Sequence, residues 1–178
     1  MICEINAMKR RPPLVVLCGI AALAIGAEPS AGDDPWLSRL VGHWVLEGRI
    51  AGKDTTHDVD AEWVLNHLYV RLHEVSRERD FSGRAAYEAI VYVTRDSAGE
   101  YAILWLDTTA SGGFAAEGIG HAKPEGASLP FVFKDARGEP SFKNTFTYDP
   151  LSGTWAWLMD NVDKGVPKPF GRVKLSPR

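Results

Sequence analysis

The feature that most constrains this chain is an alternation of apolar and polar residues that begins near Gly42 and recurs almost to its end. In the first segment Trp44, Leu46 and Ile50 share one face, while charged residues such as Glu47 fall on the other. A period of two residues is typical of a β-strand that buries one face and leaves the other in solvent.

Similar segments follow along the chain, separated by turns that contain glycine or proline. They span residues 58–65, 68–77, 87–94, 101–108, 114–122, 129–133, 141–148, 154–161 and 170–175. No long helical segments separate them, so antiparallel hairpins are expected rather than parallel crossovers. A sheet of about ten such strands leaves no exposed edge if it closes on itself. We therefore predict an all-β fold, a single antiparallel up-and-down barrel of about 8–10 strands, with an open two-sheet sandwich as the alternative.

The chain begins with a different pattern. Basic residues at 9–11 precede an uncharged, largely apolar run, Leu14 to Ile25, and Ala27 offers a small residue for cleavage. This order is typical of a secretory signal peptide, and the run is too short to span a membrane. We predict a signal peptide at 1–27, a linker at 28–35 and one barrel domain at 36–178, with periplasmic or secreted localisation.

A short helix is expected just before the first strand. Asp34 can cap it, Pro35 suits its first turn, and it should end at Leu40.

Composition narrows the possible partners. Both cysteines, Cys3 and Cys18, lie in the leader, so the mature domain must be held together by its core without disulfides. Removing three basic and one acidic residue with the leader leaves 17 basic and 22 acidic residues, a net charge of −5. That charge argues against nucleic acid as a partner. No membrane span is expected in the mature chain.

Gly42-His43-Trp44 resembles the Gly-x-Trp that begins the first strand in lipocalins and other calycins. In that superfamily the tryptophan closes one barrel end and packs under a basic side chain from the last strand. The resemblance implies that Arg172 is this partner of Trp44, because it lies in the last predicted strand. A guanidinium over an indole ring gains about 0.5–2 kcal/mol.

The chain is also similar to a family of uncharacterised, exported bacterial calycin-like domains. The matching features are Trp44, the segment 65–69 in place of a Leu-Gly-Gly-x-aromatic turn, the hairpin at 96–101 and Trp105-Leu106-Asp107. The family implies no known activity. Haem-binding calycins use a histidine near the C-terminus, and this chain has none after His121, so no cofactor is expected.

The turn at Asn66-His67 predicts the pairing of its two strands. Counting outward from a two-residue turn places Trp63 opposite Val70 and Val59 opposite Glu74. Glu74 then lies on the inner face near one rim of the barrel. Two interpretations remain open there, a solvated rim position and a contact with a ligand.

The barrel interior is the candidate ligand site, with Trp63, Val70, Glu74, Trp105 and Trp157 as candidate binding residues. No catalytic residues and no metal site are predicted. The histidines His43, His57, His67, His73 and His121 lack metal-ligand spacing.

Two further carboxylates, Asp107 and Asp160, each end an aromatic-led strand. Turn capping or a salt bridge is expected for both, although an acid–base pair would require the same residue types.

We therefore expect an exported protein that binds a small apolar or amphipathic molecule inside its barrel. Two alternatives stay open. One is an enzyme of unknown reaction that uses inner-face carboxylate and histidine groups. The other is an envelope protein that acts through its surface.

Overall fold

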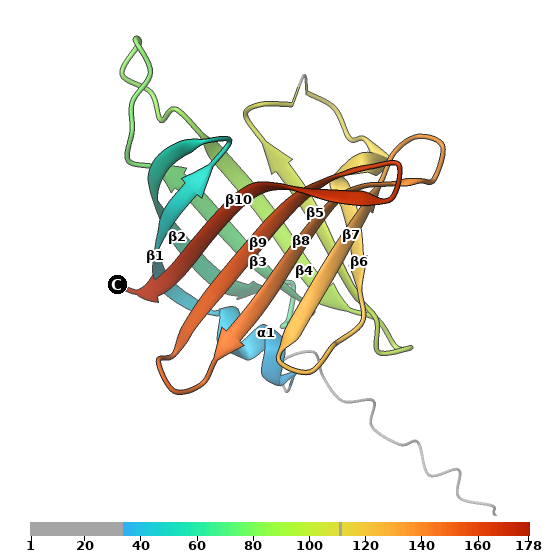
Figure 1. The fold of residues 1–178 in the computed structure, drawn as a ribbon. Helices are drawn as coiled ribbons and strands as arrows, with labels where there is room; N and C mark the ends of the chain where they lie inside the picture. Colours follow the sequence, from blue (N-terminus) through green and yellow to red (C-terminus); the bar gives the residue numbers. More distant parts are fainter. Residues whose placement is uncertain (1–33, 111) are drawn as a thin grey trace, which may run out of the picture.

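The computed structural model describes residues 34–110 and 112–178; the predicted signal peptide and most of the predicted linker lie outside them. The elements, shown in Figure 1, are α1 (Pro35–Leu40), β1 (Gly42–Ile50), β2 (Lys53–Val64), β3 (Tyr69–Ser76), β4 (Glu88–Arg95), β5 (Tyr101–Asp107), η2 (Ala116–Gly118), β6 (Ile119–Ala122), β7 (Ser128–Lys134), β8 (Pro140–Asp149), β9 (Thr154–Asp163) and β10 (Val166–Pro177).

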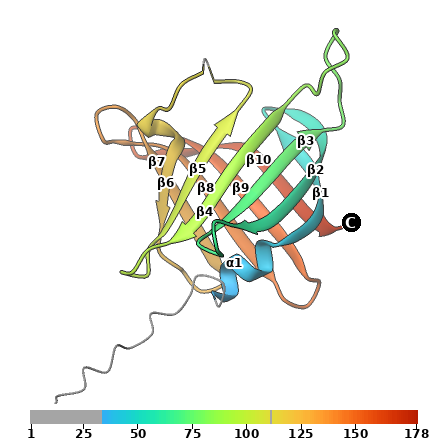
Figure 2. The ribbon, with the colours of Figure 1, turned by 180° about the vertical axis from the view of Figure 1, so that it is seen from behind.

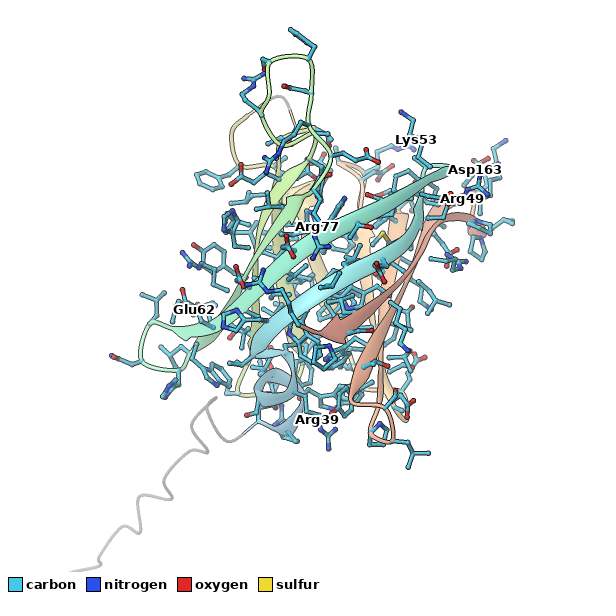
Figure 3. The ribbon with its side chains drawn as sticks, turned by 90° about the vertical axis from the view of Figure 1, so that its left-hand side faces the viewer. Arg39, Arg49, Lys53, Glu62, Arg77 and Asp163 are labelled. Carbon is cyan, nitrogen blue, oxygen red and sulfur yellow. The ribbon has the colours of Figure 1, made fainter. Side chains whose placement is uncertain are left out.

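The strands form one closed antiparallel barrel. Each strand pairs with its neighbours in sequence, and β1 pairs with β10 to complete the ring. The predicted all-β barrel is therefore confirmed, and its architecture is consistent with a calycin-like fold. The helix α1 lies across one end of the ring (Figures 1 and 2), here called the helix end. The connections β1–β2, β3–β4, β5–β6, β7–β8 and β9–β10 gather at the opposite end, here called the loop end. Figure 3 shows Arg39 at the helix end and Lys53 and Asp163 at the loop end.

The β2–β3 hairpin has the register predicted from its turn. Trp63 lies opposite Val70 and Val59 lies opposite Glu74. The turn residues Leu65, Asn66 and His67 all adopt positive φ angles, of 50°, 56° and 61°. The position of the turn, together with the alternation of the two strands, was thus sufficient to predict which side chains point into the barrel.

The first turn of α1 is fixed by one buried carboxylate. Asp34 Oδ1 accepts hydrogen bonds from the backbone N–H groups of Trp36 (2.9 Å) and Leu37 (3.0 Å), which caps the helix. Its Oδ2 accepts from the Tyr101 hydroxyl (2.6 Å) and from Arg95 (3.2 Å), both on the barrel wall. Asp34 caps α1 and Pro35 begins it, as the sequence predicted, and the Asp34 carboxylate also joins the helix to the barrel.

The last turn of α1 is held by two indoles. Trp44 Nε1–H donates to the Leu40 carbonyl (2.8 Å), and Trp155 Nε1–H donates to the Arg39 carbonyl (3.1 Å). Terminal carbonyls of a helix have no partner within it, so these bonds satisfy groups that would otherwise be buried unpaired. Trp44 is 7% exposed and packs at the helix end, as expected for a residue that closes the barrel.

The predicted contact between Arg172 and Trp44 is wrong. In the β1–β10 register Arg172 lies opposite Arg49, whereas Trp44 lies opposite Pro177. Arg172 projects from the outer face and pairs with Asp160 (2.5 Å), and it also donates to the Met159 carbonyl (2.6 Å). Side chains alternate between the two faces of β10. The residues on either side of Arg172 are buried on the inner face, so the Arg172 side chain points outward.

The predicted strand 114–122 is shorter than expected. Only Ile119–Ala122 forms β6, and it is preceded by the 3-10 turn Ala116–Gly118. Phe114 is 86% exposed in the loop before that turn. The loop continues through residue 115, and the 3-10 turn then delays the start of β6.

Trp44→Ala should destabilise the protein by about 3–5 kcal/mol, because it leaves a cavity at the helix end and an unpaired Leu40 carbonyl. Arg172→Ala should cost about 1 kcal/mol or less, because its ion pair is partly exposed. Urea unfolding followed by circular dichroism measures both. Equal decreases in the free energy of unfolding for the two variants would contradict the described packing.

Candidate functional site

The barrel interior contains a small set of buried polar side chains among many apolar ones. Those at inward-facing strand positions are His57, Glu74, Ser76 and Asn144, whereas Asp34 caps α1 and Thr154 lies at the β8–β9 turn, where it hydrogen-bonds Ser152. Buried polar groups are costly unless they are hydrogen-bonded, so each needs a structural or functional reason.

His57 and Glu74 form a buried pair on neighbouring strands. Glu74 lies opposite Val59, and His57 is two residues away on the same face of β2, so the two side chains are diagonal neighbours. His57 Nδ1 and Glu74 Oε1 are 2.5 Å apart. With Nδ1–H donating to the carboxylate, Nε2 of a neutral ring accepts from the Thr55 hydroxyl, at 2.6 Å.

Aromatic side chains continue this cluster across the barrel. The His57 ring stacks on Tyr87, with centroids 5.4 Å apart. The Tyr87 hydroxyl accepts from Trp105 Nε1–H (2.9 Å) and lies 3.4 Å from a carboxylate oxygen of Asp107. Trp105 in turn meets Trp157 edge-on, with centroids 6.1 Å apart. A continuous set of contacts therefore joins β2 and β3 to β9 through β5.

The environment of Tyr87 keeps its hydroxyl protonated. Burial raises the pKa of Tyr87 well above its ordinary value, and the negative charges of Glu74 and Asp107 raise it further. The hydroxyl is therefore a neutral donor and acceptor at physiological pH, placed between a carboxylate and an indole.

Three buried polar atoms of the interior have no hydrogen-bond partner within the described protein. They are Glu74 Oε2, Asn144 Oδ1 and Trp157 Nε1. Asn144 and Trp157 are diagonal neighbours on β8 and β9, because Asn144 pairs with Met159 and Phe146 pairs with Trp157. A further unpartnered atom, Arg71 Nε, lies on the outer face of β3. A bare buried donor or acceptor costs about 1–3 kcal/mol, so three of them mark this region as unusual.

Aromatic rings fill the middle of the barrel beneath this cluster. Phe146 stacks on Trp157 at 4.3 Å, and Phe131 meets Phe146 edge-on at 5.3 Å. All three are buried. Tyr87 and Trp105 are only partly buried. The polar cluster thus lies between an aromatic floor and the loop end.

Two shallow hollows lie on the outer surface of the wall. One, of about 250 Å³, is bordered by Glu88, Leu106 and Asp107. The other, of about 340 Å³, is lined by apolar and aromatic residues such as Tyr92 and Leu104. Neither contains the unpartnered atoms of the interior.

The structure divides the predicted ligand residues into two groups. Glu74, Trp105 and Trp157 belong to the interior cluster. Trp63 and Val70 face each other beside the β2–β3 turn at the helix end, where Trp63 meets His67 edge-on at 5.5 Å. Glu74 was expected at a solvated rim position, with contact to a ligand as the alternative. That expectation is wrong, because its side chain is 2% exposed.

The two carboxylates that end aromatic-led strands have separate roles. Asp107 accepts from the backbone N–H groups of Thr109 (2.8 Å) and Ala110 (3.2 Å), which caps a turn. Asp160 pairs with Arg172. Turn capping and a salt bridge were the expected roles, and both are confirmed. In the described ranges no group of three or more His, Cys, Asp or Glu side chains is placed to hold a metal ion.

Sequence reasoning missed His57, Tyr87 and Asn144. The signal for His57 was present, since its spacing from Val59 places it on the inner face and the register places Glu74 beside it. The signal for Tyr87 was present as well, because it belongs to the predicted strand 87–94 and falls on the same face as the buried Ala89 and Val91. Asn144 lies in a predicted strand whose neighbours Phe142 and Phe146 mark the inner face.

A scan against protein-family models finds no match for this chain, and a search of curated proteins finds none either. Within residues 34–110 and 112–178, no helix has the length and apolar character needed to cross a membrane. Function is therefore inferred from the fold and from the geometry of the barrel interior.

The raised pKa of Tyr87 predicts a loss of stability in alkaline solution. Above about pH 10 the unfolded chain loses the tyrosine proton, while the folded protein keeps it. The free energy of unfolding should be unaffected by Tyr87 below about pH 10, and above it should fall by up to about 1.4 kcal/mol per pH unit. Urea denaturation at several pH values between about 8 and 11 measures this slope.

Tyr87→Phe should reduce the alkaline slope, whereas Tyr92→Phe, on the outer face of β4, should leave it unchanged. A slope that Tyr87→Phe does not alter would contradict the buried, neutral state of this hydroxyl.

Proposed function

We propose that this protein is an exported binding protein that holds a small amphipathic or apolar molecule in the loop-end half of its barrel. The observation that carries the proposal is the set of three unpartnered buried atoms, Glu74 Oε2, Asn144 Oδ1 and Trp157 Nε1. Binding sites of this kind combine apolar walls with a few polar groups that orient the ligand.

The apolar part of such a ligand would contact the aromatic side chains around the polar atoms. Trp105 and Tyr87 are partly exposed, so they are the first interior side chains that a molecule arriving from the loop end would meet. Their movement would admit it to the buried atoms below. A ligand of about 15 non-hydrogen atoms at roughly 0.3–0.5 kcal/mol per atom would bind with a millimolar to micromolar Kd.

Export and family membership belong to the same proposal. The leader pattern at 1–27 supports periplasmic or secreted localisation, and N-terminal sequencing of the exported protein should find a new terminus at or near Glu28. The closed barrel, Trp44 and the hairpin motifs support membership of the exported calycin-like family. Trp63 and Val70 remain candidate contacts for a ligand that extends toward the helix end.

An enzymatic role is the second candidate, and the hydrogen bonds of His57 favour it. Thr55 Oγ1, the His57 ring and Glu74 follow the order hydroxyl, base and carboxylate. Hydrolases that activate a hydroxyl nucleophile use this order, with the base taking the hydroxyl proton as the oxygen attacks an acyl carbon. Binding requires only the anchors and apolar walls already described, so it is the first candidate.

Hydrolysis of p-nitrophenyl butyrate separates the two roles. An acyl-transfer site should release p-nitrophenol, and Thr55→Val should abolish that release because valine keeps the shape and lacks the hydroxyl. Thr56→Val, on the other face of β2, should retain it. A rate no greater than that of buffer would eliminate this candidate.

The binding proposal predicts saturable quenching of tryptophan emission by a ligand in the loop-end half. The experiment titrates the protein with fatty acids, retinoids, aromatic acids and aromatic amines, with native mass spectrometry of protein isolated from its own host. Trp105→Phe should weaken the quenching because this partly exposed indole contacts Trp157, whose Nε1 is unpartnered.

Trp36→Phe is the matched control, because Trp36 lies in α1 at the helix end, away from the cluster. Absence of both a response across the panel and a co-purified molecule would overturn the binding proposal. Loss of the signal in Trp63→Phe alone would move the site to the helix end.

A further inference from the structure

We infer that the ligand is an organic cation, a protonated amine on a small apolar body, with its ammonium group directed at Glu74. This inference rests on the proposed binding function and specifies the chemistry of the same site.

The first step is the charge of the interior. Among the described residues the buried polar and charged side chains include carboxylates and one histidine, but no lysine or arginine. An anionic head group placed beside Glu74 would therefore lack a buried cation to neutralise it, and a buried unpaired charge is strongly disfavoured. Lys53 lies at the loop end, but its side chain is exposed and so does not supply a buried cation. Fatty acids are poor candidates on this ground.

The second step is the hydrogen-bonding character of the unpartnered atoms. Glu74 Oε1 is occupied by His57, and Oε2 is left as a free acceptor. Asn144 Oδ1 is a second free acceptor. An ammonium group carries three donors and no acceptor, and its hydrogen bond to a carboxylate is charge-assisted. The interior therefore requires mainly donors, and a cationic donor fits Glu74 best.

The third step is the ring of aromatic side chains. The rings of His57, Tyr87, Trp105 and Trp157 are linked by the contacts already described, and they come from different sides of the barrel. Aromatic faces attract cations, more strongly where water is excluded. Asp107 adds a carboxylate beside Tyr87 toward the loop end, so the approach to Glu74 carries negative charge as well.

The experiment compares three probes that share one apolar body, namely 4-phenylbutylamine, 4-phenylbutanol and 4-phenylbutyrate. Isothermal titration calorimetry of the unmodified protein at neutral pH gives their affinities. The amine should bind about tenfold or more tightly than the alcohol, because only the amine forms a charge-assisted bond. The carboxylate should show no measurable binding.

Glu74→Gln should reduce amine affinity about tenfold or more and leave alcohol affinity nearly unchanged. Glu62→Gln is the matched control, because Glu62 is on the outer wall (Figure 3), where it pairs with Arg71. It should leave all three affinities unchanged. If Glu74→Gln does not fold, judged by circular dichroism, the selectivity of the unmodified protein still decides the question.

The outcomes separate this inference from the function beneath it. Equal binding of amine and alcohol, or tightest binding of the carboxylate, would overturn the cation inference and leave the binding function standing. The same holds if none of the three binds while an acidic or uncharged member of the wider panel quenches tryptophan emission saturably. If none of the three probes binds and no member of the wider panel quenches tryptophan emission, both proposals are overturned.

Discussion

The pairing of the first strand with the last is the constraint on which the rest of this structure depends. It is possible because Gly48 has a φ of +150°, and because a Cβ atom there would lie 2.2 Å from the Arg172 carbonyl oxygen. Any other residue would force the two backbones apart at the seam. Closure removes both sheet edges and leaves only two ends through which anything can reach the interior. The helix occupies one of them, so the loop end becomes the route to the site.

Local features of the fold were predictable from sequence, and the long-range contacts were less so. The turn at Asn66-His67 fixed the β2–β3 register, because a short turn leaves little freedom for the strands that it joins. The supposed contact of Arg172 with Trp44 failed, because the family resemblance supplied it without a register. The alternation around Arg172 argued against it, since Val173 and Leu175 mark the buried face of that strand and leave arginine outside.

The candidate site was partly predictable for a similar reason. Glu74 was identified from the hairpin register, and Trp105 and Trp157 were chosen as indoles on predicted strands. The same register together with alternation contained the position of His57. What sequence could not supply was the contact that unites them, made by Tyr87. Alternation in the predicted strand 87–94 places this side chain on the inner face, but its hydrogen bond to Trp105 is a long-range contact that alternation does not specify.

Satisfaction of polar groups differs between the two ends of the barrel, and this difference is the strongest indication of where function lies. At the helix end, Asp34 meets four donors, and the carbonyls that end α1 receive indole N–H groups. In the middle of the barrel and toward its loop end, polar atoms of Glu74, Asn144 and Trp157 are buried without partners. Stability alone would favour apolar side chains at these positions, because a partly satisfied polar cluster in an aromatic interior costs free energy. Such a cost is expected where a bound molecule supplies the missing partner, which is why the proposed ligand site is placed in this part of the barrel.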